Sequence, residues 1–223
     1  MIDERGLAGA EHLDPSYVAG YDRKAGVEAG DDVELLQRLG LDRRSTVVDV
    51  GAGTGLFAQA VAPLAGRVVA VDPSPAMLER ARGRGLECVE AGFLTYEHAG
   101  AAPDFVYSRN ALHHLPDFWK AVALARIHAA LKPGANFYLR DMVFVTMPDG
   151  TERDVDQWAD FAIKNHDFQR EGVVSHMRDE YSTFGWVIER MLTDIGFTLE
   201  SVDYHAPLHG TYLLRKPKAG EQS

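Results

Sequence analysis

Thr46-Val47-Val48-Asp49-Val50-Gly51-Ala52-Gly53-Thr54-Gly55 is the stretch that decides the fold, because a β-branched apolar run passes directly into three alternating glycines. The apolar half predicts a strand that is buried on both faces. The glycines permit a tight turn and let a ligand approach the backbone where a Cβ atom would collide with it. A helix predicted from Leu56 to about Ala62 presents unpaired N–H groups beside this loop, which favours a ligand carrying a carboxylate or phosphate.

Short apolar runs alternate with helical patterns downstream of the glycine loop. The predicted strands are Val68–Val71, Glu87–Glu90, Asp104–Ser108 and Asn136–Arg140, and the predicted helices are Pro75–Arg82 and Asp117–Leu131. Strands that alternate with helices in this way indicate right-handed βαβ units. We therefore expect an α/β fold with a doubly wound, mostly parallel sheet.

The end of the chain departs from this alternation. A helix is expected at Ser182–Asp194, and the apolar runs at Phe197–Tyr204 and Thr211–Arg215 are spaced as a closing antiparallel pair.

Residues 142–180 fit neither pattern, apart from a helix-like piece at Asp154–Asn165. An insertion at this point would lie over the carboxyl ends of the strands, where open α/β sheets bind ligands. We expect a single domain over residues 1–223, with an N-terminal helical lid at 1–40 and a cap insertion at 142–180.

The composition narrows the classes of partner. The 223 residues carry 23 Lys and Arg against 33 Asp and Glu, a formal net charge of −10, which weighs against bulk electrostatic binding of nucleic acid or anionic lipid. The single Cys88 excludes an internal disulfide and fits a reducing compartment. Neither a signal peptide nor a run of about 18 apolar residues is present, so we expect a cytoplasmic protein without a membrane span, monomeric or homodimeric.

The spacing of the glycines argues against two common types of nucleotide-binding loop. A dinucleotide fingerprint requires a third glycine at position 56, which is Leu56, and the sequence contains no phosphate-binding G-x-x-x-x-G-K-[ST] motif. Asp49 places a carboxylate at the end of the first strand. Asp72 ends the next strand, where it can accept hydrogen bonds from both hydroxyls of a ribose and would repel a phosphate.

Four motifs in order carry a family resemblance: the glycine-loop stretch 47–55, Val71-Asp72-Pro73-Ser74-Pro75-Ala76-Met77-Leu78, Ser108-Arg109-Asn110-Ala111-Leu112-His113-His114-Leu115, and Leu131-Lys132-Pro133-Gly134-Ala135. The set resembles the class I S-adenosylmethionine-dependent methyltransferases and spans about residues 40–215. The resemblance implies a Rossmann-like sheet of seven mostly parallel strands with one antiparallel strand. It also implies S-adenosylmethionine as cofactor and S-adenosylhomocysteine as product.

The resemblance also assigns cofactor contacts. The three loop glycines would line the methionine part, with Asp49 near its amino group and Asp72 on the ribose hydroxyls. Pro73 and Met77 would flank the adenine, and Asn110, followed by Ala111, would lie under the reactive end. These assignments fall on Gly51, Gly53, Gly55, Asp49, Asp72, Pro73, Met77, Asn110 and Ala111. Tyr21 matches a lid tyrosine near the cofactor carboxylate, with a plain amphipathic packing helix as the alternative.

One position departs from the family pattern. After the third strand the family often has an Asp that meets the adenine amino group, whereas this chain has Gly92 followed by Phe93. The aromatic ring could cover the adenine instead. The hydrogen-bond partner of the amino group is then unidentified, with the backbone of Leu94 as one guess.

Methyl transfer from a sulfonium depends mostly on positioning and water exclusion, and a base is needed only if the acceptor must lose a proton. The candidate catalytic residues are His114, Asp141 and His166. Their structural alternatives are a buried loop histidine, a loop ion pair and a solvated histidine. No metal site is expected, because the chain has one cysteine and Pro207 interrupts the His205–His209 spacing.

We therefore predict a methyltransferase that transfers a methyl group to O or N of a small-molecule acceptor. An RNA- or protein-directed methyltransferase is the first alternative, for which the only basic run is Arg80, Arg82 and Arg84. A non-catalytic S-adenosylmethionine-binding module is the second. A nicotinamide-dependent oxidoreductase on the same architecture is disfavoured by Leu56.

Overall fold

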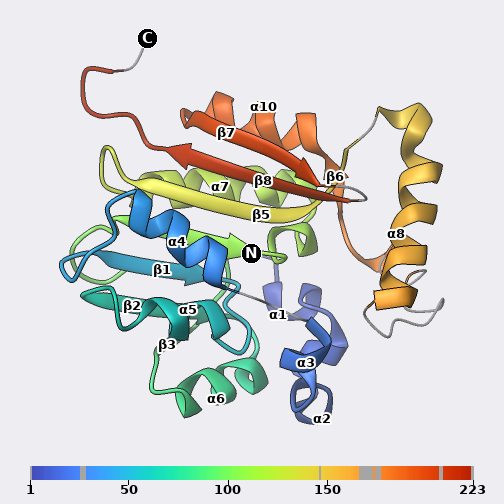
Figure 1. Cartoon of the computed structure of the whole chain (residues 1–223), viewed down its shortest axis with the longest axis horizontal. Helices are drawn as coiled ribbons and strands as arrows, with labels where there is room; N and C mark the ends of the chain where they lie inside the picture. The colour runs from blue at the N-terminus through green and yellow to red at the C-terminus, as the bar shows by residue number, and fades with distance from the viewer. Residues whose placement is uncertain are drawn as a thin grey trace.

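The computed structural model describes residues 2–25, 29–145, 147–165, 173, 177–205 and 208–221. Its centre is a sheet with the strand order β3-β2-β1-β4-β5-β8-β7 (Figure 1). The strands are β1 Thr46–Val50, β2 Arg67–Asp72, β3 Glu87–Glu90, β4 Phe105–Arg109, β5 Asn136–Phe144, β7 Thr198–His205 and β8 His209–Arg215. Strand β8 runs antiparallel to both β5 and β7, and the other neighbouring pairs are parallel, which confirms the predicted fold class.

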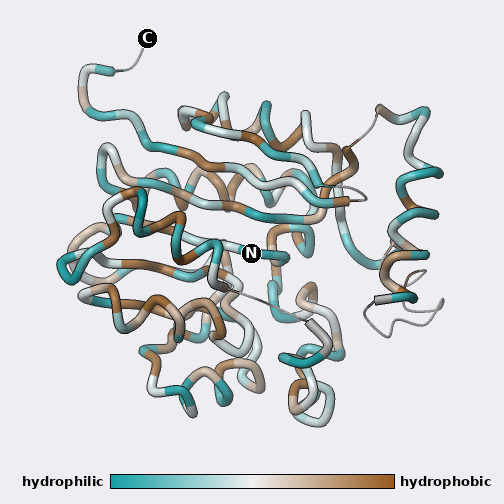
Figure 2. The backbone as a smooth tube through the Cα atoms, in the orientation of Figure 1, coloured by the Kyte–Doolittle hydropathy of each residue, from teal (hydrophilic) through white to brown (hydrophobic). Residues whose placement is uncertain are grey.

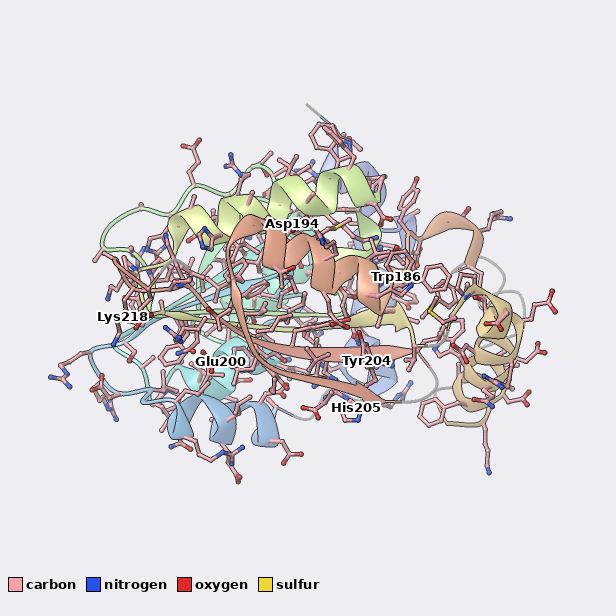
Figure 3. All side chains as sticks on the ribbon, turned by 90° about the horizontal axis from the view of Figure 1, so that it is seen from above. Trp186, Asp194, Glu200, Tyr204, His205 and Lys218 are labelled. Carbon is pink, nitrogen blue, oxygen red and sulfur yellow. The ribbon has the colours of Figure 1, made fainter. Side chains whose placement is uncertain are left out.

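Helices cover both faces of this sheet. They are α4 Gly30–Arg38, α5 Leu56–Val61, α6 Pro75–Gly83, α7 Asp117–Ala130 and α10 Gly185–Ile195. The view in Figure 3 shows the layers, with α7 and α10 side by side on one face and α4 on the other. Two core clusters correspond to these faces: one contains Leu124 and Leu192 from α7 and α10, and the other contains Leu36 and Phe57 from α4 and α5.

The apolar residues of the central strands explain why the sheet is buried. Figure 2 shows hydrophobic residues along β1 and in α5, and Val47, Val48, Val69 and Val71 are almost fully buried. Burying each of these side chains stabilises the fold by roughly 1.5–3 kcal/mol. None of the described helices is long and apolar enough to cross a bilayer.

Helix α4 packs on the sheet and is not part of the lid. Its buried Asp32 accepts hydrogen bonds from the hydroxyls of Tyr107 (2.6 Å) and Tyr138 (3.0 Å), which lie on β4 and β5. The predicted lid at 1–40 therefore reduces to the segment before α4. This segment holds α1 Glu4–Leu7, η1 Ala10–Leu13, α2 Pro15–Val18 and α3 Tyr21–Ala25, and we call residues 2–25 the N-terminal lid.

The N-terminal lid and helix α8 (Thr151–Asn165) both lie off the carboxyl ends of the parallel strands (Figure 1). Strand β5 continues four residues past the predicted end at Arg140, because Asp141 and Met142 pair with Gly210 and His209 of β8. The short strand β6 (Thr183–Phe184) pairs with the end of β5, so α10 begins at Gly185 instead of the predicted Ser182.

Candidate active site

The glycine loop follows β1, and its three glycines have left-handed backbones, with φ of 77° at Gly51, 54° at Gly53 and 80° at Gly55. A Cβ atom on Gly51 would overlap the methyl group of Ala111, and one on Gly55 would lie 2.6 Å from Leu86. These two glycines are required for packing. Gly53 differs, because its nearest neighbours would be Tyr21 Cε1 at 3.9 Å and Met77 Sδ at 4.0 Å. The space beside Gly53 is thus bordered by two of the residues predicted to contact the cofactor.

Two buried carboxylates stand beside this loop. Asp72 accepts hydrogen bonds from the backbone N–H of Gly53 at Oδ2 and of Ser74 at Oδ1, both at 2.8 Å. Burial raises the pKa of Asp72. Asp49 is 2% exposed, and burial together with the nearby Asp72 raises the pKa of Asp49 to about 8. A positively charged ligand group near both carboxylates would stabilise their ionised forms and so offset the cost of burying them.

The N-terminal lid is fastened over this edge of the sheet. Ser74 Oγ donates to the carbonyl of His12 at 2.6 Å. Asp22 accepts a hydrogen bond from Thr54 in the glycine loop and forms ion pairs with Arg84 and, at 3.6 Å, with Arg80.

Tyr21 is partly buried in the lid, and the loss of hydration there, with nearby negative groups, raises its pKa to about 12. The ring of His12 contacts the rings of Tyr17, Tyr21 and His114, with centroids 5.6–5.8 Å apart. These four rings, which we call the ring cluster, connect the lid to the exit of β4.

The exit of β4 has a strained backbone. Asn110, the one residue other than glycine with positive φ in the described part of the chain (50°), donates its N–H to the Arg140 carbonyl at 2.8 Å. Left-handed backbone costs a residue other than glycine about 1–2 kcal/mol. The turn brings Ala111 against Gly51, so the predicted cofactor loop and the predicted reactive end lie in direct contact.

His113 is held between two carboxylates. Its Nδ1 lies 2.5 Å from Asp141 Oδ1, its Nε2 lies 3.0 Å from Glu180 Oε2, and its backbone N–H donates to Asp141 Oδ2 at 3.1 Å. Burial opposes a charged imidazole, but the two carboxylates outweigh it and raise the pKa of His113 to about 10. Glu180 is positioned by the next residue, because Tyr181 donates its N–H to the His113 carbonyl.

His114 lies in a different environment from its neighbour, as expected for adjacent residues on a turn. Burial, followed by the charge on His113, lowers the pKa of His114 to about 3, so the ring is neutral near pH 7. Its Nδ1 is buried without a hydrogen-bond partner. A buried ring nitrogen without a partner costs about 1–3 kcal/mol, which favours a ligand that forms a hydrogen bond with it.

The catalytic roles of His114, Asp141 and His166 all stay predictions. Asp141 is 3% exposed and directs its oxygens to His113 and to the N–H of Met142, contacts that suit positioning of His113. His166 lies outside the described residues. Ligand-type atoms of His113, His114 and Glu180 lie within 4.8 Å of one another, and ion pairing of a protonated His113 accounts for this grouping.

The adenine contacts predicted for Gly92 and Phe93 stay predictions. The Phe93 side chain is 7% exposed and belongs to the core cluster with Val71, so the ring packs inward. The backbone of Leu94 is the other predicted partner of the amino group, and its N–H donates to Glu4 Oε1 at 3.0 Å. The same Glu4 carboxylate lies over Gly92. Sequence reasoning missed Glu4, Asp22 and Glu180, because none of them belongs to a motif.

The residues present fit the implied cofactor. Gly53 leaves room at the loop, Asp49 provides a buried carboxylate for an amino group, and Asp72 retains acceptor capacity for ribose hydroxyls beyond its two backbone hydrogen bonds. Pro73 follows Asp72 directly, and Met77 is buried at 3% exposure next to Gly53.

Comparisons with known proteins identify the family of the chain. Residues 21–202 match the family model described as a methyltransferase domain. The trans-aconitate 2-methyltransferase of Methylobacterium radiotolerans is 35% identical over 125 residues, which are 52% of this chain and 43% of that protein. The matched stretch thus spans less than half of that relative. An uncharacterized methyltransferase of Geobacillus is 26% identical over 193 residues, 85% of this chain and 86% of that protein.

Solved structures share the fold at low identity. The phosphoethanolamine N-methyltransferase 2 of Haemonchus contortus, in complex with phosphomonomethylethanolamine and S-adenosylhomocysteine, has a TM-score of 0.71 at 17% identity, covering 98% of this chain and 61% of that one. A methyltransferase in complex with the Trm112 activator of Haloferax volcanii has a TM-score of 0.66 at 19% identity, covering 91% and 97%. The family match over most of the chain and the fitted site lead to one conclusion: the chain belongs to the class I S-adenosylmethionine-dependent methyltransferases.

Proposed function

We propose that the protein methylates a small molecule at oxygen or nitrogen, and that an oxygen already ionised, such as a carboxylate, is the favoured acceptor. The observation that carries this proposal is the ring cluster, in which His12, Tyr17 and Tyr21 of the lid meet His114 at the exit of β4. A lid of aromatic rings fastened over the reactive end suits an enclosed small ligand better than a polymer.

The chemistry at His114 favours an ionised acceptor. S-adenosylmethionine, when bound, supplies a methyl group already activated by its sulfonium, so the chain has to orient the acceptor and exclude water. With a pKa of about 3, His114 cannot retain a proton taken from an alcohol or an ammonium group near pH 7. Its buried Nδ1, in the tautomer that carries the ring proton there, can donate a hydrogen bond that orients a carboxylate acceptor. A carboxylate oxygen needs no base.

Arg140 supports an acceptor that carries negative charge. It lies in the middle of β5, in register with Arg109, the last residue of β4. The side chain is partly buried, and its guanidinium has no hydrogen-bond or ion-pair partner within the described ranges. A partly buried guanidinium without a carboxylate favours a bidentate anionic ligand. The relative named trans-aconitate 2-methyltransferase is a precedent for an organic-acid acceptor.

The basic run weighs against RNA. Arg80 and Arg84 form ion pairs with Asp22, so two of the three arginines are engaged by the lid. Phosphate contacts would have to displace an internal carboxylate, which lowers the gain from each contact.

Methyl-labelled cofactor and fractionated cell extract test the proposal. The extract is divided into a low-mass filtrate, a protein fraction and an RNA fraction, and label transfer is followed in each. We expect transfer into the filtrate and release of the label as methanol in mild alkali, as for a methyl ester. Label that survives alkali would move the acceptor to nitrogen or an ether oxygen. Label removed by protease or nuclease would overturn the small-molecule assignment.

A further inference from the structure

The exit of strand β3 lacks an acidic side chain, and a carboxylate from the N-terminal lid occupies that space. Gly92 stands two residues after the end of β3. A Cβ atom on Gly92 would fall on the carboxylate of Glu4, with Oε2 and Cδ as its nearest atoms. Glu4 is 90 residues from Leu94 in the sequence, yet the two are hydrogen-bonded. The Glu4 carboxylate therefore lies where the side chain of an aspartate at position 92 would be.

Glu4 is fixed in this position by the turn that follows β3. Its Oε1 accepts hydrogen bonds from the Leu94 N–H at 3.0 Å and from Thr95 Oγ1 at 3.1 Å, and Thr95 Oγ1 accepts from the Gly92 N–H at 2.9 Å. The residue is 7% exposed. A carboxylate buried to this degree is costly, so a further donor from a ligand would stabilise it.

No positive side chain neutralises Glu4 among the residues that the structure describes. Its neighbour Arg5 pairs instead with the exposed Glu90 at the end of β3. That pair docks helix α1, whereas the Glu4 carboxylate points to the turn at 92–95. Arg5 thus docks helix α1, and Glu4 places the carboxylate. Substitutions at the two positions can therefore test these roles independently.

The position of Glu4 matches the path of a nucleoside bound at Asp72. Strands β2 and β3 are parallel, with Asp72 in register with Glu90, and the Ala91 N–H donates to the Asp72 carbonyl at 3.2 Å. The exits of the two strands therefore meet at one edge. With the ribose on Asp72, the base can extend along this edge toward Gly92, where the Glu4 carboxylate stands.

We propose that Glu4 is the hydrogen-bond acceptor for the 6-amino group of the cofactor adenine, in place of the acidic residue that the exit of β3 lacks. A carboxylate only accepts hydrogen bonds, so it selects a 6-amino purine and repels a 6-oxo purine. The inference depends on the cofactor and is independent of the proposed acceptor.

Calorimetry with two ligands tests this assignment without measuring turnover. S-adenosylhomocysteine carries the 6-amino group, and S-inosylhomocysteine carries an oxygen there. For the wild type we expect the first to bind about 30-fold more tightly, because the 6-oxo group of the second would place an acceptor against the Glu4 carboxylate. In Glu4→Gln and Glu4→Ala this ratio should fall below about 5.

A swap of the carboxylate provides the sharper test. Gly92→Asp alone should weaken S-adenosylhomocysteine binding, because the new side chain collides with Glu4. The double variant Glu4→Ala/Gly92→Asp places one carboxylate in the same space and should restore the adenosyl preference. Arg5→Ala is the matched control, because it removes the docking pair and keeps Glu4; its ratio should equal that of the wild type.

Two results would overturn the inference. An unchanged ratio in Glu4→Gln, accompanied by a lower melting temperature, would make Glu4 an anchor of helix α1 alone. A double variant that folds but binds both ligands equally would also show that a carboxylate in this position does not recognise the 6-amino group. Failure of the wild type to bind S-adenosylhomocysteine would instead contradict the cofactor assignment.

Discussion

Asp22 and Arg84 form an ion pair that ties helix α3 of the lid to the end of helix α6. The two side chains are 25% and 19% exposed. Arg84 also donates to the Thr54 carbonyl at 2.9 Å, and Asp22 accepts from the Thr54 hydroxyl. The pair therefore joins the lid to the glycine loop, and we expect cofactor exchange to require that this connection opens.

Asp22→Asn should speed the release of bound S-adenosylhomocysteine. Loss of a half-buried pair is worth about 1 kcal/mol, which corresponds to an increase in the dissociation rate of about five-fold. Stopped-flow displacement measures the rate. Asp194→Asn is the control, since it removes the exposed Arg190–Asp194 pair on α10. Equal rates in both variants and the wild type would show that the Asp22 pair does not limit exchange.

Cofactor binding should release close to one proton near pH 7. With a pKa of about 8, Asp49 is about nine-tenths protonated in the free protein at pH 7. An ammonium group beside it favours the carboxylate and lowers this pKa, so the proton leaves on binding. Affinity should therefore rise with pH between about 6 and 8.

Calorimetry in buffers of different ionisation enthalpy counts the protons released. Asp49→Asn should bind more weakly and show no dependence on the buffer. Proton uptake by the wild type, or the same release in Asp49→Asn, would contradict the role of Asp49 near the amino group.

Gly51→Ala should destabilise the protein strongly. The left-handed backbone costs alanine about 1–2 kcal/mol, and the overlap with the Ala111 methyl adds about 1–3 kcal/mol. For a chain of this length the total corresponds to a loss of roughly 5–15 °C in melting temperature. Gly83→Ala, in the last turn of α6 with open space around it, should be neutral or slightly stabilising.

The double variant Gly51→Ala/Ala111→Gly separates the two causes of destabilisation, the left-handed backbone and the overlap with the Ala111 methyl group. It should recover the part of the loss that comes from the overlap and retain the part that comes from the backbone. No recovery in differential scanning calorimetry would mean that the two loops do not press on each other.

The turnover rate should show no titration of His114 between pH 5 and 8. Because its pKa is about 3, His114 stays neutral throughout this range. His114→Ala should lower kcat about 10-fold or more through loss of orientation, while His114→Gln, which keeps a hydrogen-bond donor, should recover part of it. If the turnover rate instead rises with pH around 6.5, and this dependence disappears in His114→Gln, His114 would be a general base.

Arg140→Gln should raise KM for an anionic acceptor more than it lowers kcat. A charge-assisted pair is worth about 1.5–3 kcal/mol, which corresponds to roughly 10- to 100-fold in KM. The S-adenosylhomocysteine affinity should not change. Arg215→Gln, at the opposite end of the sheet, is the control. Equal KM values in the wild type and Arg140→Gln would remove the arginine from acceptor binding.

The strands and the glycine loop could be predicted from the sequence, because they depend on local residue patterns. Strands β1 and β3 agree at both ends, and β2 and β4 begin and end within one residue of the expected bounds. The glycine loop and Asp72 follow directly from strands that the residue pattern identifies. Strand β5 was predicted too short, because the charged pair Arg140-Asp141 resembles a strand exit. In the structure His113 neutralises Asp141, so the strand continues inside the protein.

The remaining site residues could not be predicted, because their contacts join distant parts of the chain. Glu4 meets Leu94 across 90 residues and Asp22 meets Arg84 across 62. The path of the N-terminal lid decides both contacts, and its short helices have little periodicity from which that path could be derived. Phe93 belongs to the buried core, and its contact with the adenine stays a prediction.

The location of helix α1 has a practical consequence for protein production. An affinity tag fused ahead of residue 2 would emerge two residues from Glu4, against the turn that follows β3. The C-terminal end of the described chain lies on the far side of the sheet from the lid (Figure 1). Purification handles, fluorophores and surface-attachment chemistry therefore belong after Glu221 in any ligand-affinity assay. A preparation tagged at the other end should report weakened nucleoside binding for reasons unrelated to its sequence.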